Sequence, residues 1–313
     1  MICGDAVLDD LEGEGFRIRR ESVDSYWNSY QVTLHGQNGL GRPRFDLSGR
    51  NQVTLGFLGS SHLGDVLCTT PLARLIRLRF GAQVFVVRHR STYKAFANNP
   101  YLSGHSNEQI IPLSEYAQGP GHIIQKLMDS FGLGIDPFPK PEVFLTSEET
   151  KWAWEERSHL PRNKPVAFVS LGSITEGRLV RRNPVIWQRI VDCLRKRYTV
   201  VQLALTKIAP LDETIRVDEA FLRRWQPDPV LENCMVYENL GLRRFLSLFS
   251  VADLFVGVNS GGMHAAAAFD VPSLIVLDSS RYGDYPVFPV MTEGRWTGEA
   301  FLYPQHTFIF DRA

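Results

Sequence analysis

The first residues suited to chemistry form a glycine- and serine-rich turn around one acidic side chain, Gly59-Ser60-Ser61-His62-Leu63-Gly64-Asp65-Val66. Small residues let the backbone turn sharply and approach a ligand closely, and a carboxylate can take a proton from a reacting hydroxyl. Two interpretations of Asp65 stay open: a functional carboxylate that points into a cleft, or an ordinary helix N-cap, where aspartate is favoured. Because a helix N-terminus favours negative charge, we expect the pKa of Asp65 to be lowered.

A second glycine turn reads Asn259-Ser260-Gly261-Gly262-Met263-His264-Ala265. Its backbone exposes several N–H groups at the positive end of the helix that follows, and this favours binding of a diphosphate. The alternative is a tight strand-to-helix turn that holds no ligand. His264, taken alone, is more typical of a buried histidine that hydrogen-bonds within the protein than of a functional one.

A third turn, Gly172-Ser173-Ile174-Thr175-Glu176-Gly177, is followed by Arg181 and Arg182, and Asn183-Pro184 then opens a helix. Two guanidinium groups beside a Gly/Ser turn suit a pyrophosphate leaving group, because they donate in pairs and stay protonated as negative charge builds up. A solvated basic loop is the alternative.

The sequence contains no Asp-x-Asp pair and no Cys or His spacing typical of a zinc site. Paired carboxylates are the device with which many sugar transferases hold a divalent metal on the diphosphate. We therefore expect a metal-independent site in which arginines and helix N-termini supply the counter-charge.

Apolar runs of strand length alternate with amphipathic stretches of helix length from Val53 onward, which is typical of parallel sheets covered by helices. The first half predicts a strand over Val53–Leu58, a helix over Asp65–Phe80 and a strand over Gln83–Val87. The second half predicts strands over Val166–Leu171, Thr199–Ala204, Leu254–Val258 and Ser273–Leu277, with helices over Pro184–Arg197, Leu242–Ser250 and Gly262–Phe269. We predict an α/β fold of two Rossmann-like domains facing a central cleft.

The predicted domains are an N-terminal extension over 1–50, a first Rossmann-like domain over 51–141 and a second over 142–313. The linker is placed at Gly132–Pro141, because its glycines and prolines suit neither a helix nor a central strand. Within the extension, Phe16–Arg20 and Tyr30–Leu34 alternate as short strands do, so small β structure is expected there.

The balanced charge of the sequence argues against a nucleic-acid-binding protein. The 313 residues are 44% hydrophobic and carry 34 basic and 34 acidic side chains, so no nucleic-acid partner is expected. The sequence shows neither a signal peptide nor an apolar run of about 20 residues, the length a membrane helix needs. We expect a soluble protein of the cytoplasm, or one held peripherally at the inner membrane.

Taken together, the three turns resemble those of glycosyltransferase family 9, the ADP-heptose heptosyltransferases. Ser61 to Val66 is similar to the family's Ser-x-Gly-Asp-Val-type turn, with a shift of one residue. Arg181 to Trp187 is similar to its Lys-x-Trp-Pro segment, and Asn259 to Ala267 to its Asp-Ser/Thr-Gly-x-x-His-x-x-Ala turn. Two departures are Asn259 in place of the usual Asp, and the first fifty residues, which have no counterpart in typical members.

The resemblance implies an inverting enzyme of the GT-B fold, with the acceptor on the first domain and an ADP-activated sugar on the second. Asp65 would be the general base, and Arg181 would take the place of the family's phosphate-binding lysine. The implied acceptor-side residues are Ser61, His62 and Gly64. The implied donor-binding residues are Gly172, Ser173, Thr175, Arg181, Arg182, Asn259, Ser260, Gly261, Gly262 and His264. The resemblance implies no cofactor or metal besides the nucleotide sugar.

Three alternatives stay open. The same fold could use a UDP- or GDP-sugar, or it could belong to a homologue that binds a nucleotide sugar without catalysis. A nucleotide-sugar isomerase or epimerase of two similar domains is the third. The acceptor hydroxyl could belong to a glycan, a glycolipid, a protein or a small molecule.

Overall fold

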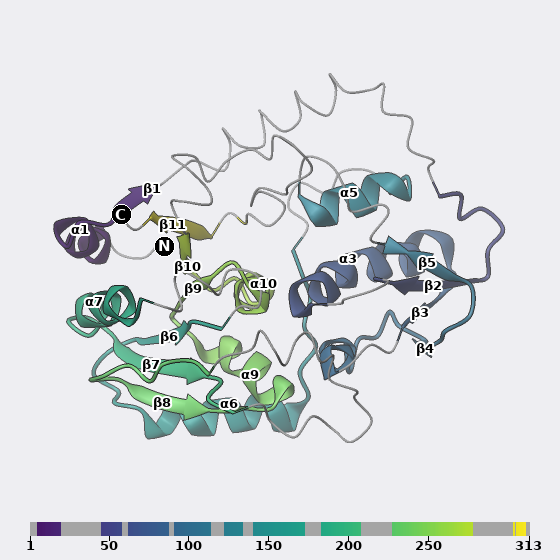
Figure 1. The fold of residues 1–313 in the computed structure, drawn as a ribbon. Helices are drawn as coiled ribbons and strands as arrows, with labels where there is room; N and C mark the ends of the chain where they lie inside the picture. Colours follow the sequence, from purple (N-terminus) through teal and green to yellow (C-terminus); the bar gives the residue numbers. More distant parts are fainter. Residues whose placement is uncertain are drawn as a thin grey trace.

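The computed structural model describes residues 5–19, 45–57, 62–87, 91–113, 122–133, 140–172, 183–207, 227–277, 303 and 305–310. The first half forms a four-stranded parallel sheet in the order β4-β3-β2-β5 (Figure 1). Its strands are β2 (Gln52–Gly56), β3 (Gln83–Val86), β4 (Gly104–His105) and β5 (Ile110–Pro112). The helical elements of this half are α3 (Leu63–Phe80), η1 (Ser91–Phe96) and α5 (Ile123–Ser130).

The second half contributes most of a seven-stranded sheet in the order β1-β11-β10-β9-β6-β7-β8. Its strands are β6 (Val166–Ser170), β7 (Thr199–Ala204), β8 (Met235–Glu238), β9 (Leu254–Val258), β10 (Ser273–Leu277) and β11 (His306–Phe310). The helical elements are α6 (Ser147–His159), α7 (Pro184–Leu194), α9 (Leu242–Leu248), η2 (Phe249–Val251) and α10 (Gly261–Ala268). Every residue of the central strands β6, β9 and β10 is buried, as in a sheet covered on both faces.

These elements confirm the alternating α/β pattern that the sequence predicts, with ends that differ by a few residues. The largest difference that affects the site is at α3, which begins at Leu63 rather than near Asp65. Of the predicted linker, residues 134–139 lie outside the described part of the chain, as do Tyr30–Leu34. The domain boundaries therefore stay predictions.

The N-terminal segment completes the sheet of the second half. The short strand predicted near Phe16–Arg20 is confirmed as β1 (Arg17–Arg19), which pairs antiparallel with β11 so that Ile18 lies opposite Ile309. The sequence analysis did not predict α1 (Asp5–Gly13), which packs against α7 and buries Leu8 and Leu11. Figure 1 shows α1 and β1 beside the C-terminal strand. At least part of the extension is thus a structural edge of the second sheet.

The two halves are joined by buried contacts between helices. One cluster of buried apolar side chains contains Leu67 of α3 together with Met263 and Ala266 of α10. A polar connection lies at Arg243 of α9, whose guanidinium donates to the carbonyl oxygen of Lys94 in η1 at 3.4 Å and is held within its own half by Glu149 Oε1 at 2.7 Å. No helix among the described residues is long and apolar enough to cross a bilayer.

Candidate active site

The first turns of α3 and α10 meet where the two halves touch. A Cβ atom on Gly261, at the start of α10, would lie 2.7 Å from Cβ of Leu63, at the start of α3. A Cβ atom on Gly64 would lie 2.7 Å from Cδ2 and 2.9 Å from Nε2 of His264. Only glycine leaves room for so close an approach. The structure therefore brings the start of α3, with Asp65, together with the start of α10, although the two lie almost 200 residues apart in the sequence.

Asp65 lies in the first turn of α3 and folds back toward the helix start. Its Oδ2 accepts a hydrogen bond of 3.3 Å from the backbone N–H of His62. The N-cap residue is His62, with extended backbone angles of −74° and 157°, and Asp65 is the third residue of the helix. The interpretation of Asp65 as the N-cap itself is therefore wrong. Its carboxylate still satisfies a backbone donor at the helix start, as acidic residues at this position commonly do.

Burial raises the pKa of Asp65, against a smaller lowering by the nearby His62 and its backbone N–H. The expectation of a lowered pKa is therefore wrong. The reason is that the two helix starts pack together and partly shield the carboxylate from water, a loss that outweighs the favourable field of one helix end. A less solvated carboxylate is a stronger base, which suits proton transfer at neutral pH.

The turn at 259–262 follows the carboxyl end of β9. β9 pairs in parallel with β6, and Ser170 lies opposite Gly257, so Gly172 and Asn259 leave the same edge of the sheet from neighbouring strands. The side-chain hydroxyl of Ser260 is shielded from solvent and has no hydrogen-bond partner in the described part of the chain. An unpaired buried hydroxyl is costly in a protein interior, and a ligand oxygen would satisfy it.

His264 is a buried, neutral side chain on α10. Its Nδ1 lies 2.6 Å from the hydroxyl oxygen of Tyr303 and 3.4 Å from Sγ of Cys68 on α3. Burial lowers the pKa of His264 to about 3. His264, which the sequence analysis places among the donor-binding residues, is thus buried inside the protein against the start of α3.

Five of the predicted site residues, Ser61, Ser173, Thr175, Arg181 and Arg182, lie outside the described ranges, and their roles stay predictions. The structure places Asp65, His62 and Gly64 at the start of α3, which meets the start of α10. On the α10 side are Ser260, Gly261, Gly262 and His264, and Gly172 and Asn259 follow neighbouring strands at the carboxyl edge of the second sheet. The sequence does not indicate Cys68 and Tyr303 as neighbours of His264, because they lie 196 and 39 residues away from it and form no motif with it. Within the described ranges, no group of three or more His, Cys, Asp or Glu side chains could hold a metal ion.

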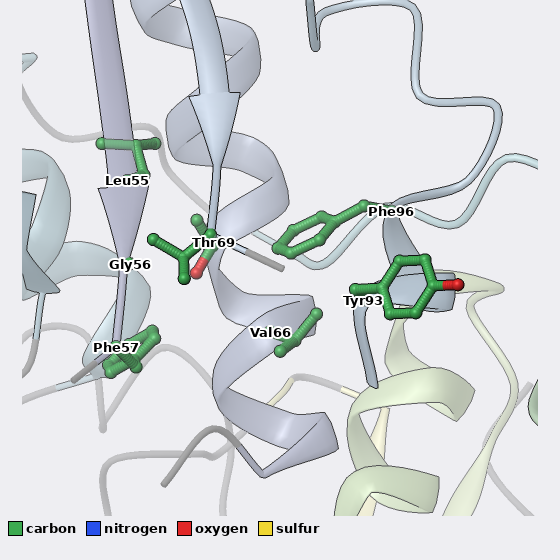
Figure 2. A pocket seen from close by; sticks show the side chains of 8 residues that line it. Leu55, Gly56, Phe57, Val66, Thr69, Tyr93 and Phe96 are labelled. Carbon is green, nitrogen blue, oxygen red and sulfur yellow. The ribbon is translucent and has the colours of Figure 1, made fainter. Parts of the chain in front are cut away.

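A small apolar hollow of about 20 Å³ lies at the carboxyl ends of β2 and β3. Figure 2 shows Val66 and Thr69 of α3 on one wall, with Tyr93 and Phe96 of η1 opposite. The hydroxyl of Thr69 donates to the backbone carbonyl of Asp65 at 3.0 Å, so this wall of the hollow is continuous with the turn that carries Asp65.

Comparison with known proteins finds similar folds but no match by sequence. The sequence matches no protein-family model and no curated protein. The structure aligns with the glycosyl transferase family 9 protein from Veillonella parvula at a TM-score of 0.57 and 13% identity, over 86% of this chain and 87% of that one. The chain has the fold of a family 9 glycosyltransferase.

A second solved structure supports the same fold. The ADP-heptose lps heptosyltransferase II of E. coli aligns at a TM-score of 0.50 and 14% identity, over 81% of this chain and 95% of that one. The GT-B arrangement expected from the sequence is confirmed at the level of fold. In this GT-B fold, the helix that carries Asp65 follows a strand of the first sheet, and residues 259–262 follow a strand of the second. The two segments meet where the starts of α3 and α10 touch.

Proposed function

We propose that this chain is an inverting glycosyltransferase that moves a sugar from a nucleotide-diphosphate donor to an acceptor hydroxyl. The observation that carries the proposal is the contact between the starts of α3 and α10 at Gly64–His264 and Leu63–Gly261. This contact places a carboxylate of raised pKa beside a glycine turn at a helix N-terminus. A base and an anion-binding turn on facing halves are what transfer from a diphosphate requires.

The donor is proposed to be ADP-heptose, bound without a metal ion. The N–H groups at the start of α10 and the unpaired hydroxyl of Ser260 would contact the diphosphate, and Arg181 would add a fixed positive charge. The support is the family 9 fold together with the motif at Asn259 to Ala267. UDP- and GDP-sugars remain the alternative donors.

The acceptor is proposed to lie on the α3 side, with its hydroxyl beside Asp65. The hydroxyl oxygen forms a bond to the anomeric carbon, the bond from that carbon to the diphosphate breaks, and its electron pair leaves on the phosphate oxygen. The hydroxyl proton passes to Asp65.

We place the reaction in a reducing compartment, the cytoplasm. Among the described residues, Cys68, Cys193 and Cys234 are all free thiols, which fits a compartment where disulfides do not persist.

Replacement of Arg181 by alanine tests the leaving-group side of the proposal. Loss of one charged donor to the departing phosphate should lower kcat about 10²- to 10³-fold, the usual effect of removing such a donor. The measurement is steady-state release of ADP from ADP-heptose with a panel of hydroxyl acceptors. Arg195→Ala, which removes a half-exposed guanidinium at the end of α7, is the matched control and should change kcat little. A loss of turnover in Arg182→Ala but not in Arg181→Ala would move the role to Arg182, and normal turnover of both would show that this loop is only a solvated basic surface.

A further inference from the structure

A buried polar triangle lies behind the candidate site. It consists of Cys68 on α3, His264 on α10 and Tyr303 just before β11, so it joins three segments far apart in the sequence. The Tyr303 hydroxyl oxygen is 2.6 Å from His264 Nδ1 and 3.7 Å from Cys68 Sγ. All three side chains are at most 5% exposed. The proposed function as stated so far uses neither Tyr303 nor Cys68.

The protons of this triangle can be assigned from its chemistry. Burial raises the pKa of both the Tyr303 hydroxyl and the Cys68 thiol, so each keeps its proton at neutral pH. His264 is neutral and has one N–H. A phenol is a stronger hydrogen-bond donor than a neutral imidazole, and an imidazole nitrogen is the stronger acceptor. Tyr303 therefore donates to Nδ1, the Cys68 thiol can donate to the Tyr303 oxygen, and the proton of His264 lies on Nε2.

The surroundings of Tyr303 hold this arrangement without adding negative charge next to it. The rings of His122 and His306 meet the Tyr303 ring edge-on, at centroid distances of 4.9 and 5.1 Å. Both histidines are buried, and burial lowers the pKa of each. Lys126 of α5 is the charged side chain on that side, and Asp65 is the carboxylate on the α3 side. Each histidine therefore stays neutral at neutral pH.

The Nε2 edge of His264 faces the start of α3. A Cβ atom on Gly64 would lie 2.9 Å from Nε2 and 2.7 Å from Cδ2, so this edge of the ring is the one in contact with the turn that carries Asp65. An N–H at this edge attracts an oxygen atom of a bound donor, whereas a bare nitrogen lone pair repels it. The tautomer of His264 therefore decides whether this edge helps or opposes donor binding.

We propose that Tyr303 is a positioning residue, whose hydroxyl bond to Nδ1 keeps the proton of His264 on Nε2 and aims that N–H at an oxygen of the nucleotide sugar. This inference rests on the proposed function for its catalytic consequence. Its structural half concerns the tautomer of His264 and stands independently of any activity.

The test is Tyr303→Phe, which removes the hydroxyl and keeps the ring that packs against the three histidines. In protein labelled with ¹⁵N-histidine, proton–nitrogen correlation spectra report which ring nitrogen of His264 carries the proton, and a His264→Gln variant assigns the signal. We expect the Nε2–H form in the wild type and a loss of that preference in Tyr303→Phe. In the transfer assay, kcat/KM for the donor should fall about tenfold, the scale of one lost hydrogen bond.

The matched control is Tyr237→Phe on β8, the edge strand of the same sheet. It removes another hydroxyl of raised pKa, about 12, and should change neither the His264 signal nor kcat/KM. A wild-type His264 protonated on Nδ1, or an unchanged tautomer in Tyr303→Phe, would overturn the inference. A changed tautomer with unchanged kcat/KM would also overturn it, because the tautomer would then not matter for the donor. Failure of the wild type to bind any nucleotide sugar would refute the proposed function, while the spectra would still decide the tautomer.

Discussion

Asp65→Asn is expected to lower transfer about 10³-fold and to leave the Kd of the donor nearly unchanged. A sugar hydroxyl is a poor nucleophile, and its proton must pass to a base as the bond to the anomeric carbon forms. A carboxylate accepts that proton and an amide of the same shape does not. The amide oxygen can still accept the hydrogen bond from the backbone N–H of His62, so the start of α3 should be kept. Single-turnover kinetics and donor calorimetry measure the two effects separately.

The same variant should not lose stability at neutral pH. Because burial raises the pKa of Asp65 above its ordinary value of 3.8, the charged carboxylate is less favourable in the folded protein than in the unfolded chain. Below about pH 4 the two proteins should be similarly stable. As the pH rises through the raised pKa, the wild type loses stability relative to the variant, and the difference stays constant above it. Urea unfolding at pH 4 and pH 8 measures this difference.

Asp192→Asn on α7 is the control for an exposed carboxylate, which contacts only Gln188 and Arg195 of its own helix end, and it should transfer at the wild-type rate. A folded Asp65→Asn protein with full activity would remove Asp65 as the base. The search would then turn to His62, the N-cap of α3, because the low pKa of His264 makes that ring a weak base.

Gly64→Ala is expected to lower both turnover and stability, because Gly64 lies in the contact between the starts of α3 and α10. The added methyl group would lie 2.7 Å from Cδ2 of His264, closer than real Cβ contacts allow. The ring cannot move aside easily, since its Nδ1 is bonded to Tyr303. The starts of α3 and α10 must therefore separate, which should lower the free energy of unfolding by about 1–3 kcal/mol, the range for overpacked sites. Turnover should fall by more than tenfold, because small misplacements of reacting groups are costly.

Gly241→Ala is the matched control, because Gly241 also begins a helix, α9, and a Cβ atom there would meet nothing within 4 Å. It should change turnover little and stability by no more than about 1 kcal/mol. Wild-type turnover and stability in Gly64→Ala would show that the close contact between the two helix starts is not part of the working site.

The sequence predicts the parts of this site that depend on local pattern. Residues 62–66 open the helix that follows β2, and residues 259–265 lead into the helix that follows β9, so their place at the carboxyl edge of a sheet follows from alternation and glycine content alone. The α/β class follows from the same alternation. Even there, the start of α3 is shifted from Asp65 to Leu63, because the N-cap is a histidine rather than one of the usual capping residues.

The rest depends on contacts between distant segments. The pKa of Asp65 is set by burial at the junction, which no local pattern contains. The triangle of Cys68, His264 and Tyr303 has no motif, because its members come from two helices and the approach to β11. β1 is three residues long and pairs with a strand at the other end of the chain, so its partner could not be inferred from its own sequence.

Metal-free binding of the nucleotide sugar is tested by titration calorimetry of ADP-heptose, with UDP- and GDP-sugars in parallel, in the presence of excess EDTA. We expect ADP-heptose to bind without a metal ion. At about 100 times its Kd, it should then stabilise the fold by about 2.7 kcal/mol in a parallel unfolding experiment. A strict requirement for a divalent metal, tight binding of a UDP-sugar without binding of ADP-heptose, or no binding of any nucleotide sugar would contradict this expectation.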